Sequence, residues 1–132
     1  MSKQDVEIIR GTLDAFNRGD WDRWLAMCHE DAELYSLRAQ LEGHPYRGPE
    51  GMRRFVADLQ EQWDYVRLEA PEIRDAGEWI VILGDFKARG SASGVELDFP
   101  VGVVFATLEG KLRYGRFYSD PAEALDAAGL SK

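Results

Sequence analysis

Three short glycine-containing turns divide the second half of the chain, and their spacing constrains the fold more than any other feature. They occur at Gly77, between Gly90 and Gly94, and at Gly110. The intervening segments have strand-like composition and lengths, so the sequence predicts four strands over residues 66–75, 79–89, 95–108 and 112–119. Because short hairpin links join strands of opposite direction, these four strands form an antiparallel meander.

The first half of the chain has apolar residues at helical rather than strand-like spacing. One such face predicts an N-terminal amphipathic helix and consists of Val6, Ile9, Leu13 and Phe16. Gly19 is a good helix stop, and Asp20 is a good N-cap for a second, short helix. The apolar residues of that second helix are Trp21, Trp24, Leu25 and Met27.

Two further helices are indicated by proline near their first positions. Gly48-Pro49-Glu50 begins a third helix, whose apolar stripe is Met52, Phe55, Val56, Leu59 and Trp63. A strand over residues 32–38 and the turn-rich segment LEGHPYRG precede it. Asp120 precedes Pro121 and predicts a capped final helix that ends at Gly129.

Helices first and an antiparallel sheet afterwards define an α+β domain. The 132 residues are typical of one domain, which we place over residues 1–132. Hydrophobic residues at 45% and charged residues at 30% are ordinary globular values, so the chain has the composition of a folded protein.

Charge, hydropathy and cysteine content exclude several classes of function. The chain has 16 basic and 24 acidic residues, a net charge of −8, which disfavours a nucleic-acid-binding surface. It has no apolar stretch approaching the roughly 20 residues that a membrane helix requires, and no signal-peptide pattern, so we expect a soluble, cytoplasmic protein. Cys28 is the only cysteine, so an intramolecular disulfide and a multi-cysteine zinc site are impossible.

Four motifs occur in a characteristic order: NRGDW, HEDAELYS, YRGPEGMRRF and GKLRYGRFYSDPAEAL. Together they resemble the nuclear-transport-factor-2-like superfamily, specifically its SnoaL-like branch, from about Val6 to Leu130. The resemblance implies a cone-shaped, strongly curved sheet around the long helices, with a pocket between them. Its members include ketosteroid isomerases, polyketide cyclases, limonene-epoxide hydrolases, scytalone dehydratases and many non-catalytic binders, so the fold does not fix the function.

The residues that carry steroid isomerisation in relatives are missing here. That reaction uses a carboxylate base together with a tyrosine and a protonated aspartate as oxyanion donors. By the resemblance, those three positions hold Ser36, Thr12 and Gly102. A hydroxyl group without an activating neighbour is a poor base, so we do not expect steroid isomerisation.

On the same resemblance, we do not expect epoxide hydrolysis. The epoxide hydrolases hold a water molecule and the epoxide oxygen with one arginine and two aspartates. The corresponding positions hold Phe86, Ala88 and Phe117, and apolar side chains cannot activate water. We therefore expect a pocket without a strong general base.

The remaining reactive side chains have structural interpretations. His29, at a helix end, and His44, in the turn-rich segment, are expected to be solvated rather than catalytic. Cys28 is adjacent to His29, but neighbours on a helix point roughly 100° apart, which favours a buried structural thiol. Because these residues lack ligand spacing, we expect no metal and no cofactor. Asp120 is interpreted as a helix cap rather than a catalytic acid.

Strand alternation assigns one face of the sheet to the interior. The residues assigned to it are unusually small and are Gly84, Phe86, Ala88, Gly102, Val104, Ala106, Gly115, Phe117 and Ser119. Helix side chains would close the space that they leave, namely Phe16, Trp24, Phe55, Leu59 and Trp63. The sequence thus predicts an apolar ligand pocket with Ser36 and Ser119 as polar anchors and Tyr35 or Arg38 near its mouth. The alternative is that the aromatic rings fill this volume.

We expect the opposite face to be apolar as well. The residues assigned to it are Val81, Leu83, Val101, Val103, Phe105, Tyr114 and Tyr118. A monomer would expose this patch to water, so we expect a homodimer through the outer face of the sheet. The resemblance implies the same assembly.

Two hypotheses for function follow. The first is a binder of a small aromatic or polycyclic compound, with cyclase- or isomerase-like chemistry as its enzymatic form. The alternative is a non-catalytic dimeric binding or scaffold module. The partners expected are therefore a small apolar molecule and a second copy of the chain.

Overall fold

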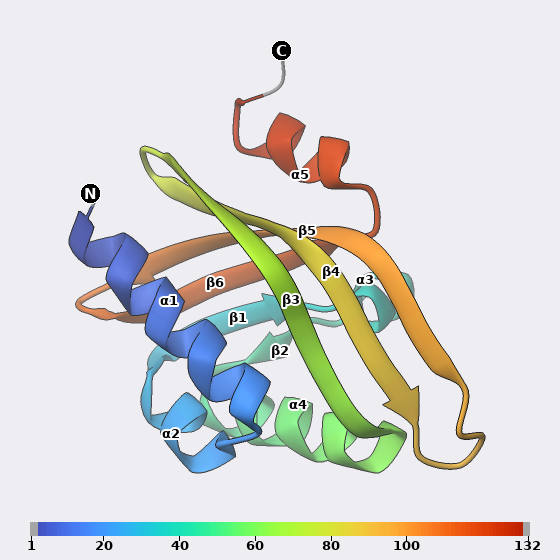
Figure 1. The fold of residues 1–132 in the computed structure, drawn as a ribbon. Coiled ribbons are helices and arrows are strands. Elements are labelled where there is room, and N and C mark those ends of the chain that lie inside the picture. The colour runs from blue at the N-terminus through green and yellow to red at the C-terminus, as the bar shows by residue number, and fades with distance from the viewer. Residues whose placement is uncertain (1–2, 131–132) are drawn as a thin grey trace.

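The computed structural model describes residues 3–130, which form five helices and six strands (Figure 1). In chain order they are α1 (Lys3–Arg18), α2 (Trp21–Ala26), β1 (Cys28–Tyr35), α3 (Leu37–Glu42), β2 (Tyr46–Arg47), α4 (Gly48–Gln62), β3 (Trp63–Ala76), β4 (Trp79–Gly90), β5 (Glu96–Leu108), β6 (Lys111–Tyr118) and α5 (Pro121–Ala127). No helix of this described part is long and apolar enough to cross a membrane.

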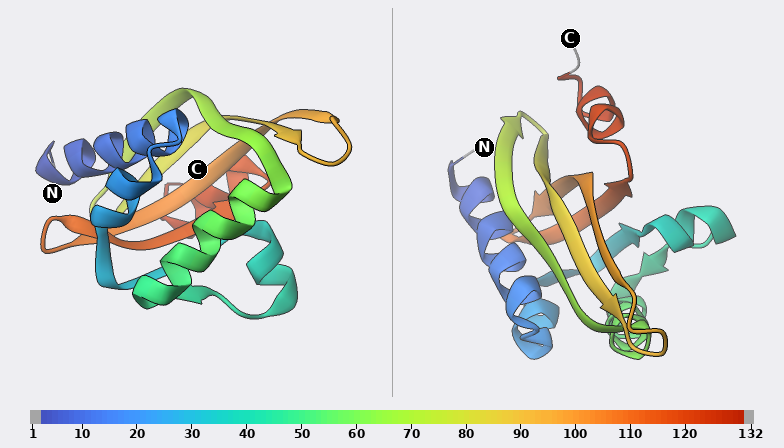
Figure 2. Two further views of the ribbon diagram at one scale, coloured as in Figure 1. Left: turned by 90° about the horizontal axis from the view of Figure 1, so that it is seen from below. Right: turned by 45° about the vertical axis from the view of Figure 1, so that its right-hand side comes forward.

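The six strands form one sheet in the order β2-β1-β6-β5-β4-β3. The predicted four-strand antiparallel meander is confirmed as β3 to β6. The sheet is mixed because β1 pairs with β6 in parallel. It curls strongly, with α1, α2 and α4 on its concave side and α5 on its convex side (Figures 1 and 2). The α+β class and the cone-like shape are thereby confirmed.

Side-chain hydrogen bonds fix the start of α2 and the position of α1. The Asp20 carboxylate accepts a hydrogen bond from the Arg23 amide at 3.3 Å and caps α2, as predicted. Near the end of α1, the Asn17 side chain both donates to the Leu68 carbonyl and accepts from its amide, each at 2.9 Å. This paired bond fastens α1 to β3 and fixes its position over the sheet.

The segment between α2 and α4 differs from the prediction. Strand β1 begins at Cys28 rather than at residue 32, and residues 37–42 form the unpredicted helix α3. Ser36 caps α3, because its Oγ accepts a hydrogen bond from the Ala39 amide at 3.1 Å. Gly43 ends the helix with a φ of 81°, a left-handed conformation that glycine adopts without strain.

His29 is buried, so the expectation of a solvated side chain is wrong. Only 6% of the residue is exposed. Its Nδ1 accepts a hydrogen bond from the Asp31 amide at 2.9 Å, and its Nε2 lies 2.7 Å from the Glu109 carboxylate. The ring thus connects β1 to the β5–β6 turn. His44 is exposed after α3, as expected.

Cys28 has the structural role that the sequence indicated. Its thiol is buried and donates a hydrogen bond to the Trp24 carbonyl at 3.4 Å. Burial raises the pKa of the thiol to about 12, so the nucleophilic thiolate is scarce near neutral pH.

The face assignment of β5 is wrong by one residue. Phe86 of β4 pairs with Phe99 of β5, so the even residues of β4 share the concave face with the odd residues of β5. Val101, Val103 and Phe105 therefore lie on the concave side, where Val103 is 1% exposed. The residues that alternate with them lie on the convex face and are Gly102, Val104 and Ala106.

Helix α5 covers part of the convex face. Val81 and Val104 are buried against Ala124 and Ala128 in a second, smaller core. Gly102 allows the close approach of the helix, since a Cβ atom at this position would lie 2.5 Å from the Ala124 Cβ. Asp120 accepts a hydrogen bond from the Ala122 amide at 3.0 Å, which confirms its capping role.

The contact between Gly102 and α5 predicts a specific stability effect. We expect Gly102→Ala to lower the free energy of unfolding by about 1–3 kcal/mol, because the added methyl overpacks against the Ala124 side chain. Urea denaturation measures this change. Gly11→Ala is the control: its Cβ would meet only the flexible end of Met27 at 3.1 Å, and alanine favours a helix.

A double-mutant cycle with Ala124→Gly identifies the cause of the effect. If overpacking at this contact is responsible, the Gly102→Ala cost shrinks in the Ala124→Gly background. Strictly additive effects of the two substitutions would contradict the explanation.

Candidate functional site

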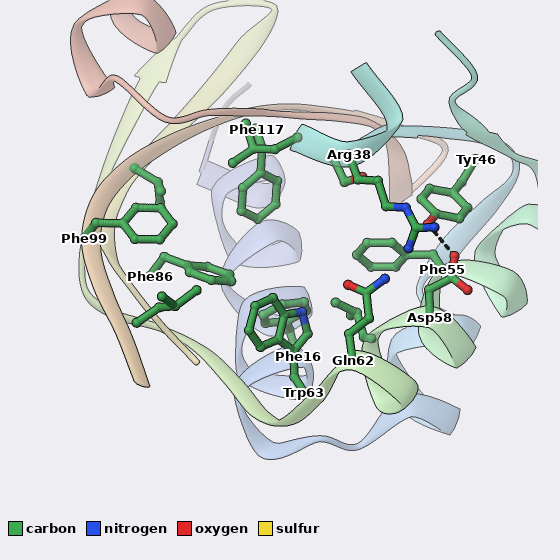
Figure 3. Close-up of a pocket in the computed structure, with 15 residues that line it drawn as sticks. Phe16, Arg38, Tyr46, Phe55, Asp58, Gln62, Trp63, Phe86, Phe99 and Phe117 are labelled. Atoms are coloured by element: carbon green, nitrogen blue, oxygen red, sulfur yellow. Dashed lines mark hydrogen bonds between the residues drawn. The ribbon is translucent and has the colours of Figure 1, made fainter. Parts of the chain in front are cut away.

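A cavity of about 270 Å³ lies on the concave side of the sheet (Figure 3). Side chains from α1, α3, α4 and all strands except β1 reach its wall. Its lining residues are Phe16, Ser36, Leu37, Arg38, Tyr46, Phe55, Asp58, Leu59, Gln62, Trp63, Phe86, Leu97, Phe99, Val101 and Phe117. Most are apolar, as is usual for sites that bind small organic molecules.

Aromatic rings form one side of the cavity, with Phe86 at their centre. Its ring centroid lies 5.2 Å from that of Phe99 and 6.2 Å from that of Phe117. Trp63 approaches the same ring edge-on, at 6.3 Å and 78°. These spacings are within the range of favourable aromatic pairs, so each ring helps to hold its neighbours in place.

Polar side chains gather at the other side of the cavity (Figure 3). We call Arg38, Tyr46, Asp58 and Gln62 the polar corner; they come from α3, β2 and α4. The Tyr46 hydroxyl donates a hydrogen bond of 2.6 Å to Asp58 Oδ2. A bond of this length between a hydroxyl and a carboxylate is strong and orients both groups.

Tyr46 remains a hydrogen-bond donor over a wide pH range. Burial and the hydrogen bond to Asp58 raise the pKa of its phenol to about 12, although Arg38 and Arg54 act in the opposite direction. The Arg54 guanidinium lies 5.0 Å from the centre of the Tyr46 ring. Near neutral pH the phenol is therefore protonated and paired with Asp58.

Helix α3 places Arg38 at the cavity. The Gln40 side-chain amide donates to the carbonyls of Tyr35 and Phe117, at 3.1 and 2.7 Å, and so fastens the helix to β1 and β6. Within α3, Arg38 Nε donates to Glu42 Oε2 at 2.9 Å. The Arg38 side chain is 58% exposed, and its guanidinium lies near Asp58 and Gln62 at the edge of the cavity (Figure 3).

The structure brings seven of the ten predicted ligand-binding residues together around the cavity. They are Phe16, Ser36, Phe55, Leu59, Trp63, Phe86 and Phe117. Trp24 lines a deeper apolar cavity of about 50 Å³, which shares four phenylalanines with the first. Gly102 lies under α5 instead, and Ser119 follows β6 outside the lining.

The sequence also placed Tyr35 or Arg38 near the mouth of the pocket. The Tyr35 ring lies on the convex face, 5.6 Å from that of Tyr114, so it does not stand at the mouth of the cavity. Arg38 does line the cavity. The buried Thr12 lines the deeper cavity, and its hydroxyl donates to the Ile8 carbonyl at 2.8 Å.

Sequence reasoning missed Tyr46, Asp58 and Gln62. Asp58 places a carboxylate in the cavity wall, which the sequence analysis did not foresee. The signal was present: Phe55, Asp58 and Gln62 lie three and four residues apart, on one face of α4. Within residues 3–130, no three His, Cys, Asp or Glu side chains lie close enough to hold a metal ion.

Comparison with known proteins agrees with this architecture. The sequence model described as a SnoaL-like domain matches residues 9–114. A comparison with curated proteins found no match.

Several solved structures have the same fold. An NTF2-like protein of unknown function from Burkholderia pseudomallei K96243 is 23% identical, with a TM-score of 0.76, over 96% of this chain and 97% of that one. TerC, co-crystallized with polyporic acid, is 20% identical, with a TM-score of 0.75, over 96% and 99%. A candidate polyketide cyclase from Xanthomonas campestris pv. campestris is 18% identical, with a TM-score of 0.76, over 96% and 97%. At these identities the likeness shows the fold alone.

The raised pKa of Tyr46 predicts a distinct alkaline transition. Because the folded state holds the phenol proton more tightly than the unfolded state, this contribution to stability is complete below about pH 10. It is lost as the pH rises toward about 12. Absorbance titration of the folded protein should show a tyrosine that ionises near pH 12, and Tyr46→Phe should remove it.

Tyr118→Phe is the matched control, since it removes a phenol on the convex face and leaves the Tyr46–Asp58 bond. Persistence of the transition near pH 12 in Tyr46→Phe would show that another group causes it.

Proposed function

The chain belongs to the SnoaL-like domain family, and from that premise we propose that its cavity binds a small aromatic or polycyclic compound. The observation that carries this proposal is the ring-lined wall around Phe86, which faces a single polar corner across the cavity (Figure 3). A small number of polar groups opposite an apolar wall is enough to orient a ligand, while most of the binding affinity comes from burial of its apolar surface.

The shape of the wall favours a flat ligand. Phe99 lies beside Phe86 at an interplanar angle of 35°, whereas Phe117 and Trp63 meet Phe86 nearly at right angles. A ring placed among them would make both face and edge contacts, which are the favourable geometries for aromatic pairs. Each Å² of apolar surface that it buries contributes about 25 cal/mol.

Binding is the primary function that we propose. If the protein is also an enzyme, we propose that it converts the bound compound in a cyclase- or isomerase-like reaction. Proton transfer in such a reaction would require a proton acceptor, for which Asp58 is the carboxylate in the wall. Steroid isomerisation and epoxide hydrolysis are not proposed, because Ser36, Phe86 and Phe117 provide no carboxylate at the positions those reactions use. The alternative, a non-catalytic binding module, predicts ligand binding without turnover.

Substitution of Trp63 tests the pocket. We expect Trp63→Leu to weaken binding of 2-ethylnaphthalene roughly threefold to tenfold, because an aromatic pair is worth about 0.5–1.5 kcal/mol beyond its buried area. Isothermal titration measures the dissociation constant. Trp79→Leu is the matched control, since Trp79 packs against Tyr114 on the opposite face of the sheet. Equal losses in both variants would contradict binding in this cavity.

We also propose a homodimer through the convex face, although fewer apolar residues lie on that face than the sequence indicated. Val101, Val103 and Phe105 belong to the interior, so they cannot form an interface. An aromatic group remains on the convex face: the Tyr114 ring lies 5.4 Å from that of Trp79 and near that of Tyr35. The group is completed by Tyr118 and Arg116.

The composition of this group supports a protein partner, because tyrosine, tryptophan and arginine are enriched at interfaces. Farther along the same face, Lys87 forms ion pairs with Glu69 and Asp98, at 3.3 and 3.6 Å. A surface that carries both signs of charge is compatible with a second copy of itself.

The corrected faces change the substitution that tests assembly. Val103→Lys would place a charge in the core, so it does not report on an interface. We expect Tyr114→Glu to convert a dimer to monomers without loss of the fold, as measured by sedimentation and circular dichroism. Wild-type protein that sediments as a monomer at micromolar concentration would refute the dimer.

A further inference from the structure

Strand β3 forms one edge of the sheet, and the end of α1 lies beside it (Figures 1 and 2). On this free side the Asn17 amide pairs with both backbone groups of Leu68, each at 2.9 Å. The backbone groups of Leu68 therefore point away from β4. Backbone groups alternate in direction along an antiparallel strand, and the register from Tyr65 to Glu69 is regular. The N–H and C=O groups of Val66 consequently point to the free side as well.

Val66 thus presents an open hydrogen-bond donor and an open acceptor. Within residues 3–130, no side chain or turn pairs with either group. Val66 lines a surface groove of about 430 Å³, whose other walls come from the α1–α2 corner, the end of α4 and the start of β3. Because backbone groups without a protein partner need water, a partner that binds in this groove replaces water at Val66.

The open part of this edge is short. Asn17 occupies the next open position, Leu68. Farther along, the register of the strand is interrupted in a stretch that includes Pro71, which has no N–H to donate. Long edge-to-edge pairing of two copies is thereby disfavoured, as it is at most natural edge strands. A short extended segment still fits at Val66.

Aromatic side chains flank the open edge. Trp21 and Tyr65 line the groove, and Trp63 belongs to the walls of both the groove and the cavity. Phe16 meets Trp21 edge-on, with ring centroids 5.4 Å apart, which helps to hold the indole in place. Tryptophan and tyrosine are enriched at interfaces, so these rings suit an apolar side chain of a partner chain.

The charge of the groove is opposite to the net charge of the chain. The chain has a net charge of −8, but the groove lining contains the guanidinium groups of Arg18 and Arg67 and one carboxylate, that of Asp64. Asp64 lies 3.7 Å from Arg89, which offsets its charge. Arg18 and Arg67 contact acidic neighbours through Nε, at 3.0 and 3.2 Å. Their terminal nitrogens are left to bind acidic groups of a partner.

We propose that this groove binds an extended acidic peptide, which adds to the edge of β3 at Val66. The peptide main chain accepts from the Val66 N–H and donates to the Val66 C=O, as the Asn17 amide does at Leu68. One apolar side chain of the peptide packs against Trp21, and the acidic residues on either side of it lie near the arginines. This interaction surface does not depend on a ligand in the cavity.

The pentapeptide acetyl-Thr-Glu-Leu-Glu-Thr-amide tests the main-chain contact. In the free protein, nuclear magnetic resonance should show faster proton exchange at the Val66 amide than at the amides of Tyr65 and Arg67, which pair with β4. Peptide at about ten times its dissociation constant should slow the exchange at Val66 roughly tenfold. Methylation of the leucine nitrogen removes the bond to the Val66 carbonyl and should weaken binding about threefold to tenfold.

Matched variants test the role of charge. Arg67→Met should weaken the acidic peptide about twofold to fivefold and leave binding of its uncharged counterpart, acetyl-Thr-Gln-Leu-Gln-Thr-amide, unchanged. Arg74→Met is the control, because Arg74 is an exposed arginine of the same strand that bonds Glu72 outside the groove. The control should leave both affinities unchanged.

Four results would overturn the proposal. The first is absence of peptide binding at millimolar concentration. The second is binding that leaves exchange at Val66 fast, or that tolerates methylation of the leucine nitrogen, since the peptide then binds elsewhere. The third is equal affinity for the acidic and uncharged peptides. The fourth is slow exchange at Val66 in the free protein that quickens on dilution, which would assign the edge to a second copy of the chain.

Discussion

The register between β4 and β5 is the constraint on which the rest of the structure depends. Pairing Phe86 with Phe99 places the bulky odd residues of β5 on the concave face and the small residue Gly102 on the convex one. A shift of one residue would exchange the two faces completely, because side chains alternate along a strand. The same register therefore builds the aromatic wall of the cavity and the gap into which α5 packs.

The cavity persists because its two sides are held by different means. On the sheet side, phenylalanine and tryptophan rings support one another through edge and tilted contacts. On the helix side, hydrogen bonds from Gln40 and Asn17 anchor α3 and α1 to backbone atoms of the sheet. The side chains of the curled sheet and of the helices do not fill the volume between these two sides, and the cavity lies there (Figure 3).

The polar corner places hydrogen-bonding groups at one side of a nearly apolar cavity. Tyr46, protonated up to about pH 12, is a fixed donor to Asp58, and Asp58 in turn faces Arg38. These groups come from a two-residue strand and from two helices that line the cavity.

Periodicity and turn chemistry in the sequence determined the α+β class, the four-strand meander, the Asp20 and Asp120 caps, and most of the aromatic wall. These features depend on local backbone preference and on the spacing of apolar residues, both of which are readable along the chain. The alternation of Leu97 and Phe99 with the acidic residues Glu96 and Asp98 even indicated the correct face of β5, although the interpretation missed it. Only the tertiary structure brought Arg38, Tyr46, Asp58 and Gln62 together, and only it buried His29 against Glu109. Each of those meetings depends on how separate elements pack around the curled sheet, which local sequence patterns do not encode.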